Sequence, residues 1–375
     1  MPKARAANNV VRTAGRCSDE GKTKTMRVIT QIANDDLRAA QKMAQVAEAC
    51  GFDSVVTAEN AHSCFLPLGV AALVTERIQL GTAVAMAFPR SPTITAHTAW
   101  DLHKASNGRF YLGLGSQVKA HNERRFGVPW SAPAPRMRDY VGALRAVWRA
   151  WETGEKLDFH SETYNLTLMT PNFSPKPTGL PTIPISIAAV GPGMQRLGGE
   201  VADGVRLHPF STRRYLAEVS SVRIGEGIAR GGRDRRNVEV IAGGYGFIGT
   251  GRNGEAVAKA RAYVRFRIAF YCSTRDYWDV LRLHDLVWLG ERVNPLPRQG
   301  RWSEMAEQIP EEIVDLFATV TDYEALPEAV EKRYGGYADT VLLQIGPDED
   351  IERLSACVKA IQRIPTPFER YATVA

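Results

Sequence analysis

Cysteine is scarce in this sequence of 375 residues, and its spacing argues against both a disulfide framework and a metal centre. The cysteines are odd in number, scattered and never arranged as CxxC; they are Cys17, Cys50, Cys64, Cys272 and Cys357. The HExxH, GxSxG and P-loop signatures are also absent. We therefore predict no metal site, and we expect a cytoplasmic protein because scattered, unpaired thiols suit a reducing compartment.

Long apolar runs and basic patches with interleaved aromatics are missing as well. No stretch approaches the ~20 apolar residues that cross a bilayer, so neither a membrane nor a nucleic acid is an expected partner. The net charge of +6 comes from 47 basic and 41 acidic residues. Much of it lies in residues 1–25, where Lys3, Arg5, Arg12 and Arg16 precede any acid. This segment lacks the apolar centre of a secretory signal, so we predict a disordered basic tail, with an organelle transit peptide as the alternative.

Patterns typical of strands and helices alternate from residue 26 onward. Near-continuous apolar runs indicate strands that are covered on both faces, as in parallel sheets. The predicted strands are residues 26–32, 53–57, 78–85, 109–115, 183–189, 204–210, 238–249 and 340–346. The first predicted helix is capped by Asp35 and stopped by Gly51. The other predicted helices span residues 66–75, 92–105, 136–151 and 348–361.

Eight strands in strict alternation with helices predict an α/β fold, a closed (β/α)8 barrel of the TIM type, as one domain over residues 26–375. Roughly ninety residues separate the seventh and eighth strands, far more than one crossover helix needs. We therefore predict an extended insertion at about residues 254–338, rich in aromatics and arginine and close to the substrate entrance. We predict that residues 158–181 form a loop or small hairpin over the barrel mouth. Residues 230–236 are predicted to form a solvated basic turn. An open doubly wound sheet is the alternative, but no GxGxxG follows the first strand.

The segment from Ile78 to Gln117 carries the clearest strand–helix–strand pattern. Ser91 and Pro92 predict an N-cap followed by proline at the first helical position, and Asn107-Gly108 predicts the helix end. The strands end in AMAFPR and GLGSQ, which are small or polar. Because ligands bind at the carboxyl ends of parallel strands, these ends are expected to line a site.

A second motif, AAVGPGMQRLGGE, joins a strand to a helix through a glycine-proline turn. Free backbone N–H groups at a helix start bind anions, and glycine lets a phosphate come close. We predict a phosphate site here. The alternative is an ordinary turn with proline at the first helical position.

Titratable and polar side chains also follow predicted strands. Glu59 and Asn60 end the second strand, His62 comes two residues later, and His121 and His208 follow the fourth and sixth strands. Strand-end polar residues of barrels are usually site residues, and histidine suits proton transfer near neutral pH. We predict that Glu59, Asn60, His62 and His208 serve catalysis and that His121 contacts the substrate. The alternatives are a loop-capping Glu-Asn pair and surface histidines.

Four motifs in order resemble the luciferase-like superfamily, most closely its deazaflavin branch, which uses coenzyme F420. They are ACGFDSVVTAEN, LGTAVAMAFPRSP, GRFYLGLGSQ and IPISIAAVGPGMQRLGGEVADGV, within residues 26–346. The resemblance implies a TIM-type barrel and hydride transfer between the cofactor and an organic alcohol, carbonyl or activated alkene. An FMN-dependent monooxygenase that uses oxygen is the nearest alternative, and a catalytically silent flavin- or ligand-binding barrel is an alternative of another class.

The resemblance also implies roles for individual residues. It places a non-prolyl cis peptide at Ala83-Val84, with Met86 facing the cofactor ring or the pocket, and it places His208 near the cofactor or the polar end of the substrate. The family often has histidine after the acidic residue at the second strand end, where this chain has Asn60. The remaining cofactor-binding candidates are Ser116, Gln117, Val190, Gly191, Pro192, Gly193 and Met194. We expect a small, apolar or ring-containing substrate and a homodimer or higher homo-oligomer.

Overall fold

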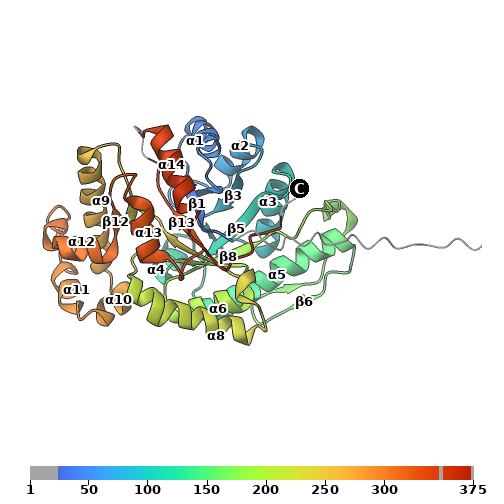
Figure 1. Ribbon diagram of the computed structural model, residues 1–375. Helices are drawn as coiled ribbons and strands as arrows, with labels where there is room; N and C mark the ends of the chain where they lie inside the picture. The colour runs from blue at the N-terminus through green and yellow to red at the C-terminus, as the bar shows by residue number, and fades with distance from the viewer. Residues whose placement is uncertain (1–23, 346–348, 373–375) are drawn as a thin grey trace, which may run out of the picture.

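A closed ring of eight parallel strands forms the centre of the computed structural model, which describes residues 24–345 and 349–372 (Figure 1). The strands are β1 (Arg27–Gln31), β2 (Ser54–Thr57), β3 (Gln79–Thr82), β5 (Phe110–Gly115), β8 (Ile185–Ala189), β9 (Gly204–Leu207), β10 (Glu239–Gly243) and β13 (Thr340–Leu342). They pair in the order β3-β2-β1-β13-β10-β9-β8-β5, and β5 pairs again with β3, where Leu80 lies opposite Phe110. The predicted (β/α)8 barrel is therefore confirmed, and the open sheet is excluded.

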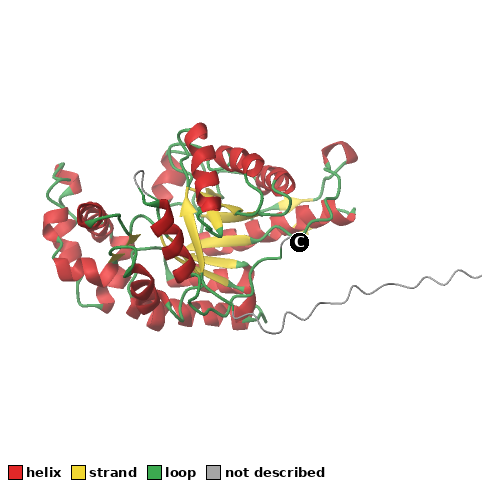
Figure 2. Cartoon of the chain, turned by 45° about the horizontal axis from the view of Figure 1, so that its top comes forward, coloured by secondary structure: helices red, strands yellow, loops and turns green. Residues whose placement is uncertain are grey.

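Helices surround the strands on the outside (Figure 2). They are α1 (Leu37–Ala49), α2 (Leu66–Val74), α3 (Pro92–Ala105), α4 (Lys119–Arg124), α5 (Pro133–Thr153), α6 (Pro192–Val201), α7 (Arg213–Tyr215), α8 (Ser221–Arg230), α13 (Leu326–Tyr334) and α14 (Ile351–Ile361). The Ser91 hydroxyl caps α3 with Pro92 at its first position, as the sequence predicts. The cap of α1 is Asp36 rather than Asp35, because the Asp36 carboxylate accepts the free amides of Arg38 and Ala39.

Several predicted strands end earlier than expected or are interrupted, and the eighth, predicted over residues 340–346, ends at Leu342. The third is divided at Ala83-Val84, where the peptide bond is cis as the resemblance implies, and β4 (Ala85–Met86) continues beside β5. The sixth ends at Leu207, so that His208 follows the strand. The seventh stops at Gly243 because residues 243–246 all have positive φ, a region that glycine adopts without steric cost. Its predicted continuation is β11 (Ile248–Gly249), which leaves the barrel.

The chain between β10 and β13 builds a second apolar core beside the barrel. It contains α9 (Gly254–Cys272), α10 (Trp278–Leu283), α11 (Val287–Val293), α12 (Glu311–Phe317) and β12 (Thr319–Val320), the last paired with β11. Helices α9, α11 and α12 lie at the left of the barrel in Figure 1. Phe210, just after β9, stacks on Phe317 with 4.4 Å between ring centroids. The insertion is thereby anchored to the carboxyl end of a barrel strand.

Residues 158–181 do contain a small hairpin, formed by β6 (Phe159–His160) and β7 (Asn165–Leu166), but not over the barrel mouth. Backbone amides of this segment donate hydrogen bonds to the carboxylates of Asp139 and Glu152, both on α5. The segment leads from α5 into β8, and connections that enter strands lie at the amino end of the barrel. The prediction of its position was therefore wrong.

The basic segment 230–236 is not simply solvated. Arg233 donates to the carbonyl of Ala202, and Arg235 forms an ion pair with the buried carboxylate of Asp339 at 2.8 Å. The prediction of a solvated turn overlooked these partners because they are distant in sequence.

The predicted basic tail lies almost entirely outside the described residues. Its last two residues, Lys24 and Thr25, belong to the fold, because Thr25 bridges to Pro365 and Lys24 pairs with Glu369. Within the described ranges, no helix combines the length and the apolar character needed to cross a membrane. The same part of the chain holds no grouping of metal-ligating side chains.

Candidate active site at the barrel mouth

A pocket of about 90 Å³ opens at the carboxyl ends of the barrel strands. Its lining comes from nearly every side of the ring: Gln31, Ala83, Val84, Ala188, Ala189, Val190, Arg206, Leu207, His208, Pro209, Gly243, Gly244, Tyr245 and Leu342. Four of the residues predicted from sequence meet here, namely Ala83, Val84, Val190 and His208. The walls are mostly apolar, so a flat organic ring would lose little solvation on entering.

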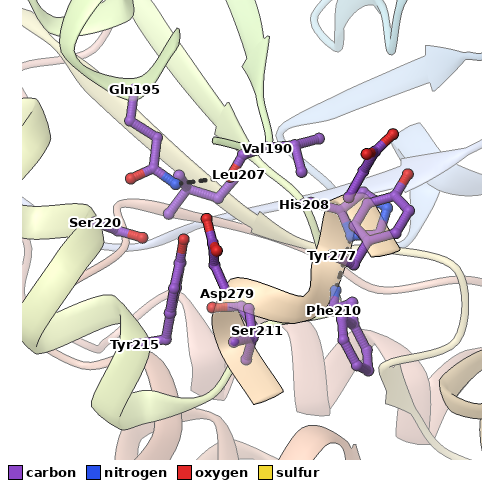
Figure 3. A pocket seen from close by; sticks show the side chains of 12 residues that line it. Val190, Gln195, Leu207, His208, Phe210, Ser211, Tyr215, Ser220, Tyr277 and Asp279 are labelled. Carbon is purple, nitrogen blue, oxygen red and sulfur yellow. Dashed lines mark hydrogen bonds between the residues drawn. The ribbon is translucent and has the colours of Figure 1, made fainter. Parts of the chain in front are cut away.

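His208 is the predicted catalytic residue that the structure places in this pocket. Burial, assisted by the nearby charge of Arg267, lowers the pKa of the His208 ring to about 3. Its Nδ1 accepts a hydrogen bond of 3.1 Å from the backbone N–H of Phe210 (Figure 3). A neutral imidazole with an accepting Nδ1 carries its proton on Nε2. His208 is therefore a neutral hydrogen-bond donor rather than a group that titrates near neutral pH.

Aromatic side chains from the insertion and the β10–β11 turn surround His208. The ring centroids of Tyr271, Tyr277 and Tyr245 lie 4.4, 4.5 and 6.4 Å from that of His208, and Tyr277 lies beside it in Figure 3. The guanidinium of Arg267 lies over the Tyr245 ring at 4.8 Å and bonds the Tyr271 hydroxyl. The insertion thus forms one wall of the mouth.

Glu59 lies at the end of β2 and is fully engaged. Its carboxylate accepts the backbone N–H of Met86 at 2.7 Å and two N–H groups of Arg90. The Glu59 side chain is 10% exposed. A carboxylate whose oxygens accept from three donors is held in place, so this geometry favours a role in holding the segment around buried Met86.

The predicted residues Asn60, His62 and His121 do not line the mouth pocket. The Asn60 side chain accepts from Asn34 and from the backbone of Ala61, as a loop-capping residue does. His62 and His121 are exposed. Their assignment to catalysis and to substrate binding stays a prediction.

The predicted phosphate turn begins α6. Gly191 is the N-cap and Pro192 the first helical residue, followed by exposed Gly193 and half-buried Met194. A Cβ atom added at Gly191 or Gly193 would meet no atom within 4 Å. The space above the helix start is therefore open, as a phosphate site requires.

Ser116 and Gln117 follow β5 and are half-buried. The Ser116 carbonyl accepts from the Asn122 side chain, and the Gln117 side chain accepts from the backbone of Val118. Both residues therefore shape the β5–α4 turn, and cofactor contact by either stays a prediction.

Three polar pocket residues were not predicted from the sequence, namely Arg206, Gln31 and Tyr245. Arg206 lies on β9, two positions before His208, and Gln31 ends β1. A signal was present, because residues two apart on a strand share a face and Arg206 is a charge inside an otherwise apolar run. Tyr271 and Tyr277 were expected near the entrance only as members of the aromatic insertion.

Proteins of known sequence resemble this chain along most of its length. A Mycobacterium tuberculosis protein described as uncharacterized is 42% identical over 322 residues, which cover 86% of this chain and 94% of the relative. The 5,10-methylenetetrahydromethanopterin reductase of Archaeoglobus fulgidus is 28% identical, over 81% of this chain and 89% of the relative.

Solved structures share the fold at low sequence identity. The coenzyme F420 dependent tetrahydromethanopterin reductase from Methanopyrus kandleri has a TM-score of 0.73 at 19% identity, covering 91% of this chain and 98% of its own. The EDTA monooxygenase from Chelativorans sp. BNC1 has a TM-score of 0.67 at 11% identity, covering 93% and 97%. The sequence model of one family, the luciferase-like monooxygenases, matches residues 15–340. The chain belongs to the luciferase-like monooxygenase family.

Proposed function

We propose that the protein is an oxidoreductase that transfers a hydride between coenzyme F420 and an organic alcohol, carbonyl or activated alkene. The observation that carries the proposal is the mouth pocket, whose mostly apolar walls include a neutral donor, His208, and a guanidinium, Arg206. The names of two similar proteins support the choice of cofactor. One solved structure is that of a coenzyme F420 dependent tetrahydromethanopterin reductase, and the Archaeoglobus fulgidus relative is named as a 5,10-methylenetetrahydromethanopterin reductase.

The residues present fit such a cofactor. Arg206 has buried nitrogen atoms for which the described residues supply no partner, and the start of α6 offers open space at Gly191 and Gly193. The small residues Ala83 and Ala188 would lie against the ring, while the helix start would hold the phosphate. When bound, the deazaflavin supplies the carbon that gives or takes the hydride.

The chain's own residues then manage position, water and proton. His208 holds a proton on Nε2 and would donate a hydrogen bond to the substrate oxygen, which stabilises charge developing on that atom. Tyr271 and Tyr277 pack around His208 and shield it from bulk water. This wall suits an apolar or ring-containing substrate. Glu59 and Arg90 together hold the segment around Met86 in place.

Cofactor titration tests the proposal. The purified protein is titrated with coenzyme F420 and with FMN while fluorescence quenching is followed, and the complexes are then mixed with a panel of alcohols and carbonyls. We expect tighter binding of F420 and a spectral change of its ring with at least one substrate class. A clear preference for FMN with oxygen consumption would instead identify a monooxygenase, and binding without any turnover would identify a silent barrel.

A further inference from the structure

Arg206 is a half-buried charged side chain inside the barrel, and two of its nitrogen atoms have no partner among the described residues. Its Nε and Nη2 atoms are buried, and none of the described residues lies within hydrogen-bond distance of them. The residues that line the pocket beside it include no aspartate or glutamate. Arginine offers only donors and no acceptor, and buried N–H groups that lack an acceptor cost free energy. Such an arrangement is retained where a ligand supplies the missing acceptor.

Arg27, a second arginine inside the barrel, differs from Arg206 because protein side chains accept its hydrogen bonds. Arg27 on β1 forms a buried ion pair with Glu239 and also donates to Gln79. Both arginines are close enough to Tyr111 to oppose the rise that burial causes in the pKa of its hydroxyl. Glu239 lies nearer the amino end of the barrel and is occupied by Arg27, Thr340 and Tyr371. It is therefore not available to Arg206.

One other guanidinium atom near the mouth, Arg267 Nε, is also buried and unpaired, but Arg267 has a partner because it donates to the Tyr271 hydroxyl. Water explains the neutral unpaired atoms there better than it explains Arg206. Gln195 Oε1, Ser211 Oγ and Ser220 Oγ are buried, unpaired and neutral, and their residues line a cavity of about 20 Å³ behind His208 (Figure 3). That space holds about one water molecule, which can bond several such groups. Arg206 instead faces the larger mouth pocket, whose lining is mostly apolar and contains no carboxylate.

We propose that the Arg206 guanidinium binds the N1–C2=O edge of the deazaflavin ring and favours the reduced cofactor. This inference rests on the proposed function. A flat ring between Ala83 and Ala188 can present one polar edge toward the barrel interior, where Arg206 supplies the donors and Gln31 a further amide. Reduction of the ring places negative charge on that edge, and a fixed positive charge beside it stabilises the charged form.

The test compares Arg206→Met and Arg206→Lys with the wild-type protein, without any substrate. Dissociation constants for oxidised and reduced F420 are measured anaerobically from the quenching of protein fluorescence. Loss of a charged hydrogen-bond donor should weaken the reduced complex by ~10²-fold and the oxidised complex by ~10-fold in Arg206→Met. The tenfold difference corresponds to a midpoint potential of the bound cofactor lower by ~30 mV. Arg206→Lys keeps the charge and should lie between the two.

Thermal unfolding of the cofactor-free proteins separates a binding role from a structural one. Arg206→Met removes an uncompensated charge, so its Tm should equal or exceed that of the wild type. Arg27→Met is the matched control; it strands Glu239 and should lower the Tm.

Two results would overturn the assignment. One is wild-type affinity of Arg206→Met for both redox forms, and the other is a Tm loss as large as that of Arg27→Met. If the wild type binds neither form of F420, the proposed function fails and this assignment with it. Tight wild-type binding with an unaffected Arg206→Met refutes the assignment alone.

Discussion

The two ends of the barrel interior treat buried charge in opposite ways. At the amino end, Arg27 and Glu239 are 2% and 0% exposed and form an ion pair. Thr340 and Tyr371 also donate to Glu239, and the Tyr371 ring lies beneath the Arg27 guanidinium at 5.6 Å. At the carboxyl end, Arg206 has no such partners among the described residues. The charged groups at the amino end therefore find their partners within the protein, whereas Arg206 at the carboxyl end does not find them among the described residues.

This difference shows where the fold is stabilised and where it is prepared for a ligand. The C-terminal segment closes the amino end, where Tyr371 packs on Tyr111 and Arg370 pairs with Asp53. The mouth is instead bordered by glycine turns and by the aromatic wall of the insertion. In barrel enzymes the carboxyl end of the strands carries the chemistry and the amino end carries stability. The charge pairing inside this barrel follows the same division.

Breaking the pair at the amino end should have the largest effect. Glu239→Gln leaves Arg27 buried without a counter-charge, and we expect a loss of ~3–5 kcal/mol in the free energy of unfolding. Urea denaturation measures it. The double variant Arg27→Met/Glu239→Leu should recover a large part of the loss, because two apolar groups replace both charges. A stability of Glu239→Gln equal to that of the wild type would contradict the contrast between the two ends.

The next effect concerns turnover at the mouth. His208→Phe keeps an aromatic ring but removes the Nε2 donor, so we expect a fall in kcat of ~10²-fold with little change in cofactor affinity. Because the pKa of His208 is about 3 in the fold, the pH–rate profile of the wild type should show no limb from this residue near neutrality. An unchanged kcat in His208→Phe would remove the residue from the mechanism.

The lowered pKa of His208 also makes the stability of the fold depend on pH. The unfolded chain binds a proton at His208 near the ordinary pKa of 6.5, whereas the folded chain does so only at about 3. The neutral ring therefore contributes stability fully above pH 6.5, and this contribution is lost as the pH falls toward 3. Urea midpoints between pH 4 and 7 should fall less steeply for His208→Phe than for the wild type.

A smaller effect is expected at the start of α6. Gly193→Val adds a side chain into open space and replaces glycine by a better helix former, so the Tm should not fall. The same side chain would block close approach of a phosphate to the backbone, and we expect ~10-fold weaker F420 binding. Gly193→Ala, with its smaller side chain, should lose less. Unchanged affinity in both variants would place the phosphate elsewhere.

The fold was predictable because its signals are local. Near-continuous apolar runs, separated by helical segments, located all eight barrel strands. The Ser91-Pro92 pair located the start of α3. The end of the seventh strand was missed because four consecutive residues with positive φ terminate it, although their neighbours are apolar. The partners of Arg233 and Arg235 could not be foreseen, since Ala202 and Asp339 are brought to them only by the closed ring.

The site was predictable only in part, for a related reason. Sequence can tell which residues follow a strand, but not whether the chain then turns into the mouth or away from it. His208 turns inward, where the backbone of Phe210 and the insertion's tyrosines hold it. His62 lies five residues after the end of β2 and is on the surface. Arg206 could have been predicted as a site residue, because it lies two positions before His208 and residues two apart in an extended segment share a face.

Substitution of His62 should have the smallest effect on turnover, and it therefore tests how far the active site extends from the mouth pocket. The sequence places it among the proton donors, whereas the structure exposes it outside the described pockets. We expect His62→Ala to change kcat, cofactor affinity and the pH–rate profile by less than ~2-fold, because an exposed side chain that touches no ligand contributes little. Steady-state kinetics beside His208→Phe make the comparison direct. A large loss of turnover in His62→Ala with normal stability would mean that the β2–α2 loop moves over the mouth when ligands bind, and the active site would then extend beyond the pocket described here.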